Sequence, residues 1–152
     1  MSPKEATPAP GLRRKSRETA LSLLYQWDMG VQDTNRLLEQ HFQEHKIPSK
    51  AKGFAEDLFH GVIKNLSSLD ENLSRVSTHW RIDRMSVIDR NILRMAIFEI
   101  LHVHDVPRKV SINEAIEIGK SYGTEDSGSF INGILDRFQK PEDDSTPSAD
   151  AS

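Results

Sequence analysis

Apolar residues recur every three or four positions along almost the whole chain, and this spacing limits the possible fold more than any other feature. It is the period of an α-helix that buries one face. No segment shows the alternation of apolar and polar residues that is typical of a half-buried strand. We therefore predict an all-α fold with about seven helices, arranged as two small packed helical bundles.

Polar residues before the apolar stripes indicate where several helices begin. Single N-caps are expected at Asp33 or Thr34, at Ser49 and at Ser86, and capping boxes at Ser68–Glu71 and Ser111–Glu114. Gly123 is expected to end a helix in the left-handed conformation. In the first helix, Leu21, Leu24, Tyr25 and Met29 have the spacing of a buried stripe.

The pattern divides the chain into four parts. Residues 1–11 are rich in proline and predict a disordered leader, and residues 141–152 predict a disordered acidic tail. The folded part is then residues 12–140. A break at residues 78–86 separates subdomains at about 12–80 and 81–140.

Composition excludes several classes of protein. The chain of 152 residues has no cysteine, which excludes thiol nucleophiles, Cys-based zinc sites and disulfide scaffolds. No apolar run approaches the roughly 20 residues that cross a bilayer, and the first ten residues hold no signal-peptide core, so a cytoplasmic protein without membrane association is expected. His41 with His45, and His102 with His104, lack the spacing of a metal site. No nucleotide-binding loop or nucleophile elbow occurs, so we predict no enzyme activity, cofactor or metal.

The net charge of −3 conceals a concentrated basic segment. Residues 141–152 hold four acidic residues and no basic one, so the rest of the chain carries a net charge of +1. Within it, Arg13, Arg14, Lys15 and Arg17 gather at the start of the first helix, where cations oppose the helix dipole. Phosphate groups of a nucleic acid would explain this placement. The alternatives are a solvated helix start and a contact with an acidic protein.

Aromatic residues offer a second indication of nucleic-acid binding, although a weaker one. Tyr25 and Trp27 lie on the first helix, and packing is the simpler explanation for both, with base stacking as the alternative. Phe130 and Ile131 are adjacent on the last helix, so one of them is expected to be exposed.

Three segments resemble one known family. Residues 105–138 (DVPRKVSINEAIEIGKSYGTEDSGSFINGILDRF) closely resemble the C-terminal signature of the NusB family of bacterial transcription antitermination factors. Residues 13–30 (RRKSRETALSLLYQWDMG) resemble the family's Arg-rich opening helix, and residues 88–100 (IDRNILRMAIFEI) its central helix. The similarity covers residues 12–140.

The resemblance implies an RNA-binding protein without catalytic activity. Members of the family bind boxA, a single-stranded element in the leader RNA of ribosomal RNA operons, together with NusE, a ribosomal protein of the small subunit. The pair joins other Nus factors on RNA polymerase and suppresses premature termination. The matched positions imply RNA contacts at the Arg-rich start and at the corner before the last helix: Arg13, Arg14, Lys15, Arg17, Lys120, Tyr122, Asp126 and Phe130.

Two other interpretations remain open at this point. The chain could be a protein-interaction module whose basic segment is covered in a homodimer. It could also be the RNA-binding part of a ribosomal RNA cytosine-5 methyltransferase, although it lacks the glycine-rich cofactor loop that such enzymes carry. The proline-rich leader and the acidic tail depart from the family pattern, and an acidic tail would compete with RNA for the basic segment.

Overall fold

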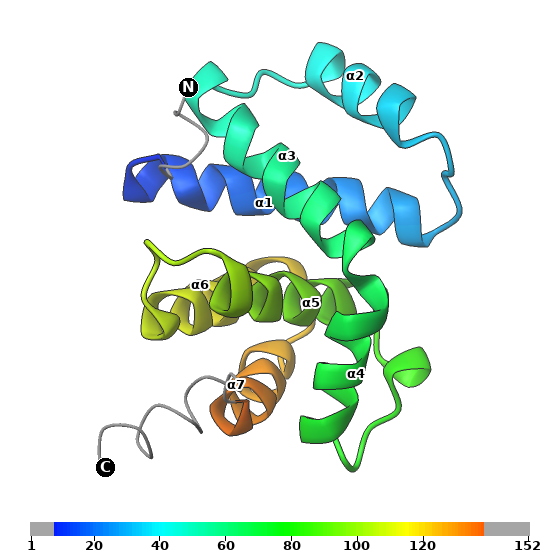
Figure 1. Ribbon diagram of the computed structural model, residues 1–152, viewed down its shortest axis with the longest axis vertical. Helices are drawn as coiled ribbons and strands as arrows, with labels where there is room; N and C mark the ends of the chain where they lie inside the picture. Colours follow the sequence, from blue (N-terminus) through cyan, green and yellow to red (C-terminus); the bar gives the residue numbers. More distant parts are fainter. Residues whose placement is uncertain (1–7, 139–152) are drawn as a thin grey trace, which may run out of the picture.

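The computed structural model describes residues 8–138, and within them the fold is all-α, as predicted (Figure 1). These residues form seven α-helices and one short 3-10 helix, with no strand. In chain order the elements are α1 (Pro10–Asp28), α2 (Thr34–Glu44), α3 (Ser49–Lys64), α4 (Leu66–Val76), η2 (Ile82–Arg84), α5 (Val87–His102), α6 (Arg108–Tyr122) and α7 (Ser127–Arg137).

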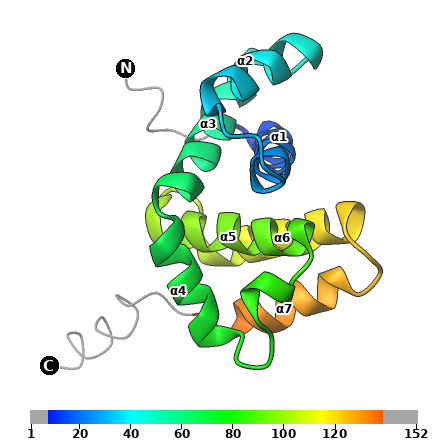
Figure 2. The same ribbon diagram turned by 90° about the vertical axis from the view of Figure 1, so that its right-hand side faces the viewer.

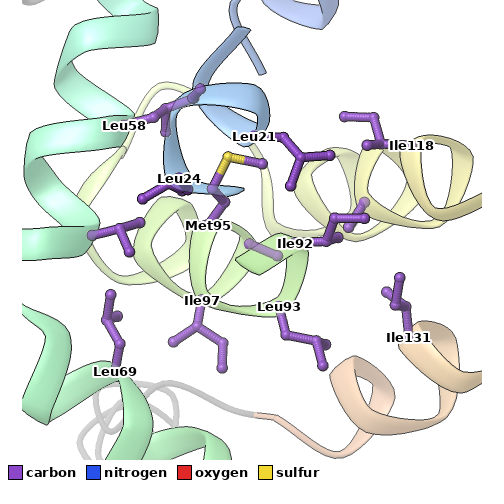
Figure 3. Packing of buried hydrophobic residues seen from close by; sticks show 14 of the residues in the cluster. Leu21, Leu24, Leu58, Leu69, Ile92, Leu93, Met95, Ile97, Ile118 and Ile131 are labelled. Atoms are coloured by element: carbon purple, nitrogen blue, oxygen red, sulfur yellow. The ribbon is translucent and has the colours of Figure 1, made fainter. Parts of the chain in front are cut away.

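Helix α5 is the centre of the molecule. Its residues 91–97 are all buried, so the helix is enclosed on every side. It contacts α1, α3, α4, α6 and α7. Figure 3 shows Ile92, Met95 and Ile97 of α5 among apolar side chains from the surrounding helices.

The other helices form two groups on either side of this centre. Helices α1, α2 and α3 lie together at one end, while α4, α6 and α7 surround α5 at the other (Figures 1 and 2). Two bundles were predicted, but α4 packs on α5 and α7 instead of joining the first group. In the structure the chain passes from the first group to the second at Asn65, where α3 ends and α4 begins. A long apolar face on α4, with Leu69 and Leu73 fully buried, explains this attachment.

The predicted helix starts are partly correct. Asp33 accepts a hydrogen bond from Arg36 N, and Ser86 accepts one from Asp89 N, so both are N-caps as expected. Both capping boxes are wrong, because α4 begins at Leu66 and α6 at Arg108, each a few residues earlier than predicted. Ser49 is the first residue of α3 and makes no capping hydrogen bond.

The two ends of the chain are only partly described. Helix α1 begins at Pro10, two residues before the predicted start of the folded part at residue 12, because a proline in the first turn already has a helical φ. The remainder of the predicted leader before residue 8, and the acidic tail at 141–152, lie outside the described residues. Among residues 8–138, no helix is both long and apolar enough to span a bilayer.

Candidate nucleic-acid interface

The four cations at the start of α1 differ in how far they are buried and in whether they form ion pairs. Arg17 is buried, with its side chain 3% exposed, and its guanidinium donates to both carboxylate oxygens of Glu99 at 2.7 and 2.8 Å. Glu99 also accepts from the Ser111 hydroxyl at 2.8 Å, and the guanidinium lies 5.6 Å from the centre of the Phe54 ring. The hydrogen-bonding groups of Arg17 are therefore used in the interior, and we do not propose Arg17 as an RNA contact.

Arg14 also forms an ion pair within the protein, but its side chain is only partly buried. Its guanidinium forms a bidentate ion pair with Glu114 of α6, with 2.8 Å between Nη2 and Oε2. Hydrogen bonding to Arg14 lowers the pKa of Glu114, against the opposing effect of burial. The Arg14 side chain remains 38% exposed, so one side of it faces solvent. Arg14 joins α1 to α6 and still reaches the surface.

Arg13 and Lys15 supply the accessible positive charge. Lys15 is exposed, and Arg13 is half-buried with its Nε donating to the Pro8 carbonyl at 2.6 Å. Among residues 8–138, neither takes part in an ion pair. Cations with no ion-pair partner at a helix start, where they oppose the dipole, are available to an anionic ligand.

The corner between α6 and α7 lies on the same side of the molecule as Arg14. Tyr122, at the end of α6, is 49% exposed. Burial first, and then the neighbouring carboxylate of Glu18 in α1, raise the pKa of the Tyr122 hydroxyl, while Arg14 lowers it. The structure therefore brings together two of the segments that the resemblance singled out, through Arg14, Glu18 and Tyr122.

The corner itself is tightly packed around Gly123. The expected left-handed conformation is wrong, because Gly123 has φ −96° and ψ −154°. A Cβ at this position would lie 2.2 Å from Ser127 Oγ and 2.9 Å from the Gly119 carbonyl oxygen. Ser127 Oγ needs that space, since it accepts a hydrogen bond from Thr124 N at 2.9 Å. Glycine is required here for close approach and not for backbone handedness.

The remaining predicted contacts surround the corner. Asp126 is exposed at the start of α7, and Lys120 is exposed in the last turn of α6, where it pairs with Glu117 at 3.3 Å. Phe130 is half-buried, and its ring meets that of Trp80 edge to face, with 5.5 Å between centroids and 88° between planes. The neighbouring Ile131 is fully buried, so the two residues face different ways, although Phe130 is half-buried and not exposed as predicted.

Two positions on α1 differ from the sequence-based expectation. Tyr25 is 40% exposed and Met29 61% exposed, so the predicted buried stripe is wrong at both. Leu21 and Leu24 are buried as predicted, and Ala20 and Leu23 complete the apolar part of the buried face. Tyr25 follows Glu18 by seven residues, or two helical turns, and therefore continues the exposed face that begins at Arg14.

Sequence reasoning missed Trp80 and the partners of the two arginines. In the sequence, Trp80 belongs to the break at residues 78–86 and to none of the motifs described above, although an aromatic residue within a polar loop is itself a signal. Glu99 and Glu114 carry no local pattern that would identify them as partners of α1. No group of three or more histidine and acidic side chains among residues 8–138 is arranged to hold a metal ion.

Comparisons with known proteins agree with the motifs and the geometry. The NusB family model matches residues 14–140. The transcription antitermination protein NusB of Myxococcus xanthus is 47% identical over 131 residues, which is 84% of this chain and 94% of the relative. The protein of the same name from Citrifermentans bemidjiense is 45% identical over 134 residues, which is 83% of this chain and 92% of the relative.

Solved structures show the same fold. A structure of NusB from T. maritima aligns with a TM-score of 0.76 and 41% identity, covering 87% of this chain and 91% of that one. A chain from the crystal structure of antitermination factors NusB and NusE in complex with dsRNA aligns with a TM-score of 0.74 and 25% identity, covering 84% and 96%. The shared sequence over nearly the whole described chain, together with the shared arrangement of helices, shows that this chain belongs to the NusB family.

Proposed function

We propose that this protein is a transcription antitermination factor that binds the boxA element of ribosomal RNA leader transcripts together with NusE. Relatives that are 45–47% identical carry the name transcription antitermination protein NusB. A chain of the same fold occurs in a complex with NusE and dsRNA. In this role the protein acts in the cytoplasm, with other Nus factors and RNA polymerase, and it binds without making or breaking covalent bonds.

The observation that carries this proposal is the position of Arg14 beside the α6–α7 corner, with Arg13 and Lys15 as its neighbours at the start of α1. The cations attract and neutralise phosphates, while Tyr122, Asp126 and Phe130 offer a ring face, an acceptor and an apolar surface to bases. Lys120 stands on the same corner and adds a further cation. Charge on one side and aromatic groups on the other form the combination that single-stranded RNA requires.

A binding experiment tests the basic segment. The double variant R13A/K15A is expected to bind a boxA oligonucleotide more weakly, both with and without NusE. Since two phosphate contacts are removed, the slope of log affinity against log salt should fall by about 1.4 for a single strand. The control is K64A, which removes an exposed cation from the end of α3. Equal affinity and equal slope for R13A/K15A and the unmodified protein would contradict the proposal.

Self-association is a related question about the same surface. A homodimer that covered residues 13–15 would have to dissociate before RNA bound, so sedimentation with and without boxA RNA measures it directly. Under the RNA-binding proposal, any dimer of this kind dissociates as RNA is added.

A further inference from the structure

We propose that Trp80 stacks on a base of the bound RNA, and that it extends the aromatic surface of Phe130 beyond the α6–α7 corner. The inference rests on the proposed RNA-binding function and adds a residue outside both segments considered above. Trp80 lies in the loop between α4 and η2, far from either segment in sequence, and reaches α7 only through the fold.

Trp80 exposes an unusually large aromatic surface. Its exposed fraction is 58%, whereas the other tryptophan, Trp27, packs against the core. The Trp80 and Phe130 rings are nearly perpendicular, so at most one face of one ring is covered by the edge of the other. At least one broad face is therefore open to a ligand, beside a residue already proposed to contact RNA.

The loop that carries Trp80 is held in place by hydrogen bonds. Trp80 N donates to the Ser77 carbonyl at 2.9 Å, and the buried Ser77 hydroxyl donates to the Leu73 carbonyl of α4 at 2.8 Å. Arg137 of α7 donates to the Val76 carbonyl at 3.1 Å, which fastens the end of α4, where the loop begins, to the helix that bears Phe130. The ring is thus positioned before any ligand arrives, which reduces the entropy lost on binding.

The surroundings of Trp80 favour a nucleobase over an apolar protein surface. Thr78, His79, Arg81 and Asp83 are all exposed polar residues, and Arg81 pairs with Asp83 at 2.8 Å. A tryptophan that anchors a protein partner usually stands within an apolar patch from which water is excluded. A flat ring within a polar border suits a base, which has an apolar face and polar edges.

The ion pair at Arg81 and Asp83 also predicts how this contact responds to salt. Because the two charges neutralise each other, this pair offers little net attraction to phosphate. The contribution of Trp80 should therefore come from stacking and depend little on ionic strength. This separates it from the contribution of Arg13 and Lys15.

The experiment compares W80A, W80L and W80F in the full chain, with NusE and a boxA oligonucleotide. W80A and W80L are expected to weaken binding about 5- to 100-fold, the range for one stacked base, with no change in the salt slope. W80F should retain most of the affinity, since it keeps an aromatic face. V31A, which shortens another exposed apolar side chain, is the matched control and should bind like the unmodified protein.

Two further measurements identify the ligand group. A series of oligonucleotides, each lacking one base, should contain one strand to which W80A and the unmodified protein bind equally. In a W27F background Trp80 is the sole tryptophan, and its fluorescence should be quenched when boxA RNA binds.

Three results would overturn the inference: unchanged affinity in W80A, equal affinity in W80L and W80F, or weaker NusE binding by W80A in the absence of RNA. The last would make Trp80 a protein contact. If R13A/K15A lost affinity while W80A did not, the RNA-binding function would stand and only the stacking role would fail. If neither variant lost affinity, the proposed function itself would be wrong.

Discussion

At the scale of single residues, Arg13 and Arg17 show how one helical turn separates an arginine without an ion pair among residues 8–138 from one that is paired in the interior. The two residues have the same side chain and the same local sequence pattern. Arg17 meets Glu99, which lies 82 residues further along the chain, and Arg14 meets Glu114, which lies 100 residues further. The sequence could predict the basic segment, but it could not predict which of its members are neutralised, because that depends on where α5 and α6 pack.

We expect R17A to destabilise the protein strongly. It would leave the Glu99 carboxylate buried beside α1 without its guanidinium partner, and breaking a buried pair in this way costs about 3–5 kcal/mol. Urea unfolding measures the loss. R13A is the comparison, because Arg13 has no ion-pair partner among residues 8–138, and its midpoint should stay close to that of the unmodified protein. Equal midpoints for R17A and R13A would contradict the structural role of Arg17.

The pair between Arg14 and Glu114 should make stability depend on acid pH. Hydrogen bonding to Arg14 lowers the pKa of Glu114 in the folded state. The pair therefore contributes fully above the ordinary carboxyl pKa of about 4.3, and its contribution disappears as the pH falls through the lowered folded-state pKa. Melting temperatures between pH 6 and pH 2.5 should fall less steeply for R14Q than for the unmodified protein. Parallel curves for the two proteins would count against the assignment.

At the scale of elements, a local signal marked the start of α5 correctly but failed at α6, where its side chains have tertiary partners. Ser86 caps α5 as predicted and binds Asp89 N. Ser111 and Glu114 have the spacing of a capping box, yet Ser111 donates to Glu99 and Glu114 pairs with Arg14. Both side chains therefore make contacts between helices and do not cap α6, which begins at Arg108. The spacing of the apolar residues predicted the helices more reliably, because a helix can bury one face only if its apolar residues keep that spacing.

The α6–α7 corner gives a prediction with an internal control. In G123A the new methyl group would occupy the space of Ser127 Oγ and crowd the Gly119 carbonyl, so we expect a destabilisation of about 1–3 kcal/mol. In G133A, on α7, nothing lies within 4 Å of the added methyl group, so helix propensity should stabilise the protein by about 0.5–1 kcal/mol. Unfolding midpoints that moved in the same direction for both variants would show that the corner is more adaptable than its packing indicates.

At the scale of the whole molecule, α5 should make the two helix groups unfold as one unit. It shares contacts with α1 and α3 on one side and with α4, α6 and α7 on the other. Arg94 of α5 binds Asp28 of α1 and Asp70 of α4 at 3.2 and 2.8 Å, which links the groups through charge as well as through the apolar core. Neither group could lose its helices without exposing a face of α5, and the sequence alone gave no measure of this dependence.

The two tryptophans allow this cooperativity to be tested directly. Trp27 lies on α1 in the first group, and Trp80 contacts α7 in the second. Single-tryptophan variants W80F and W27F should report urea transitions that each coincide with the loss of helix measured by circular dichroism of the same variant. A fluorescence transition that preceded the loss of helix in either variant would mean that its group unfolds separately, and that α5 belongs energetically to the other group. Coincident transitions would instead mean that RNA bound at the start of α1 and at the α6–α7 corner stabilises the whole protein, since both segments belong to one cooperative unit.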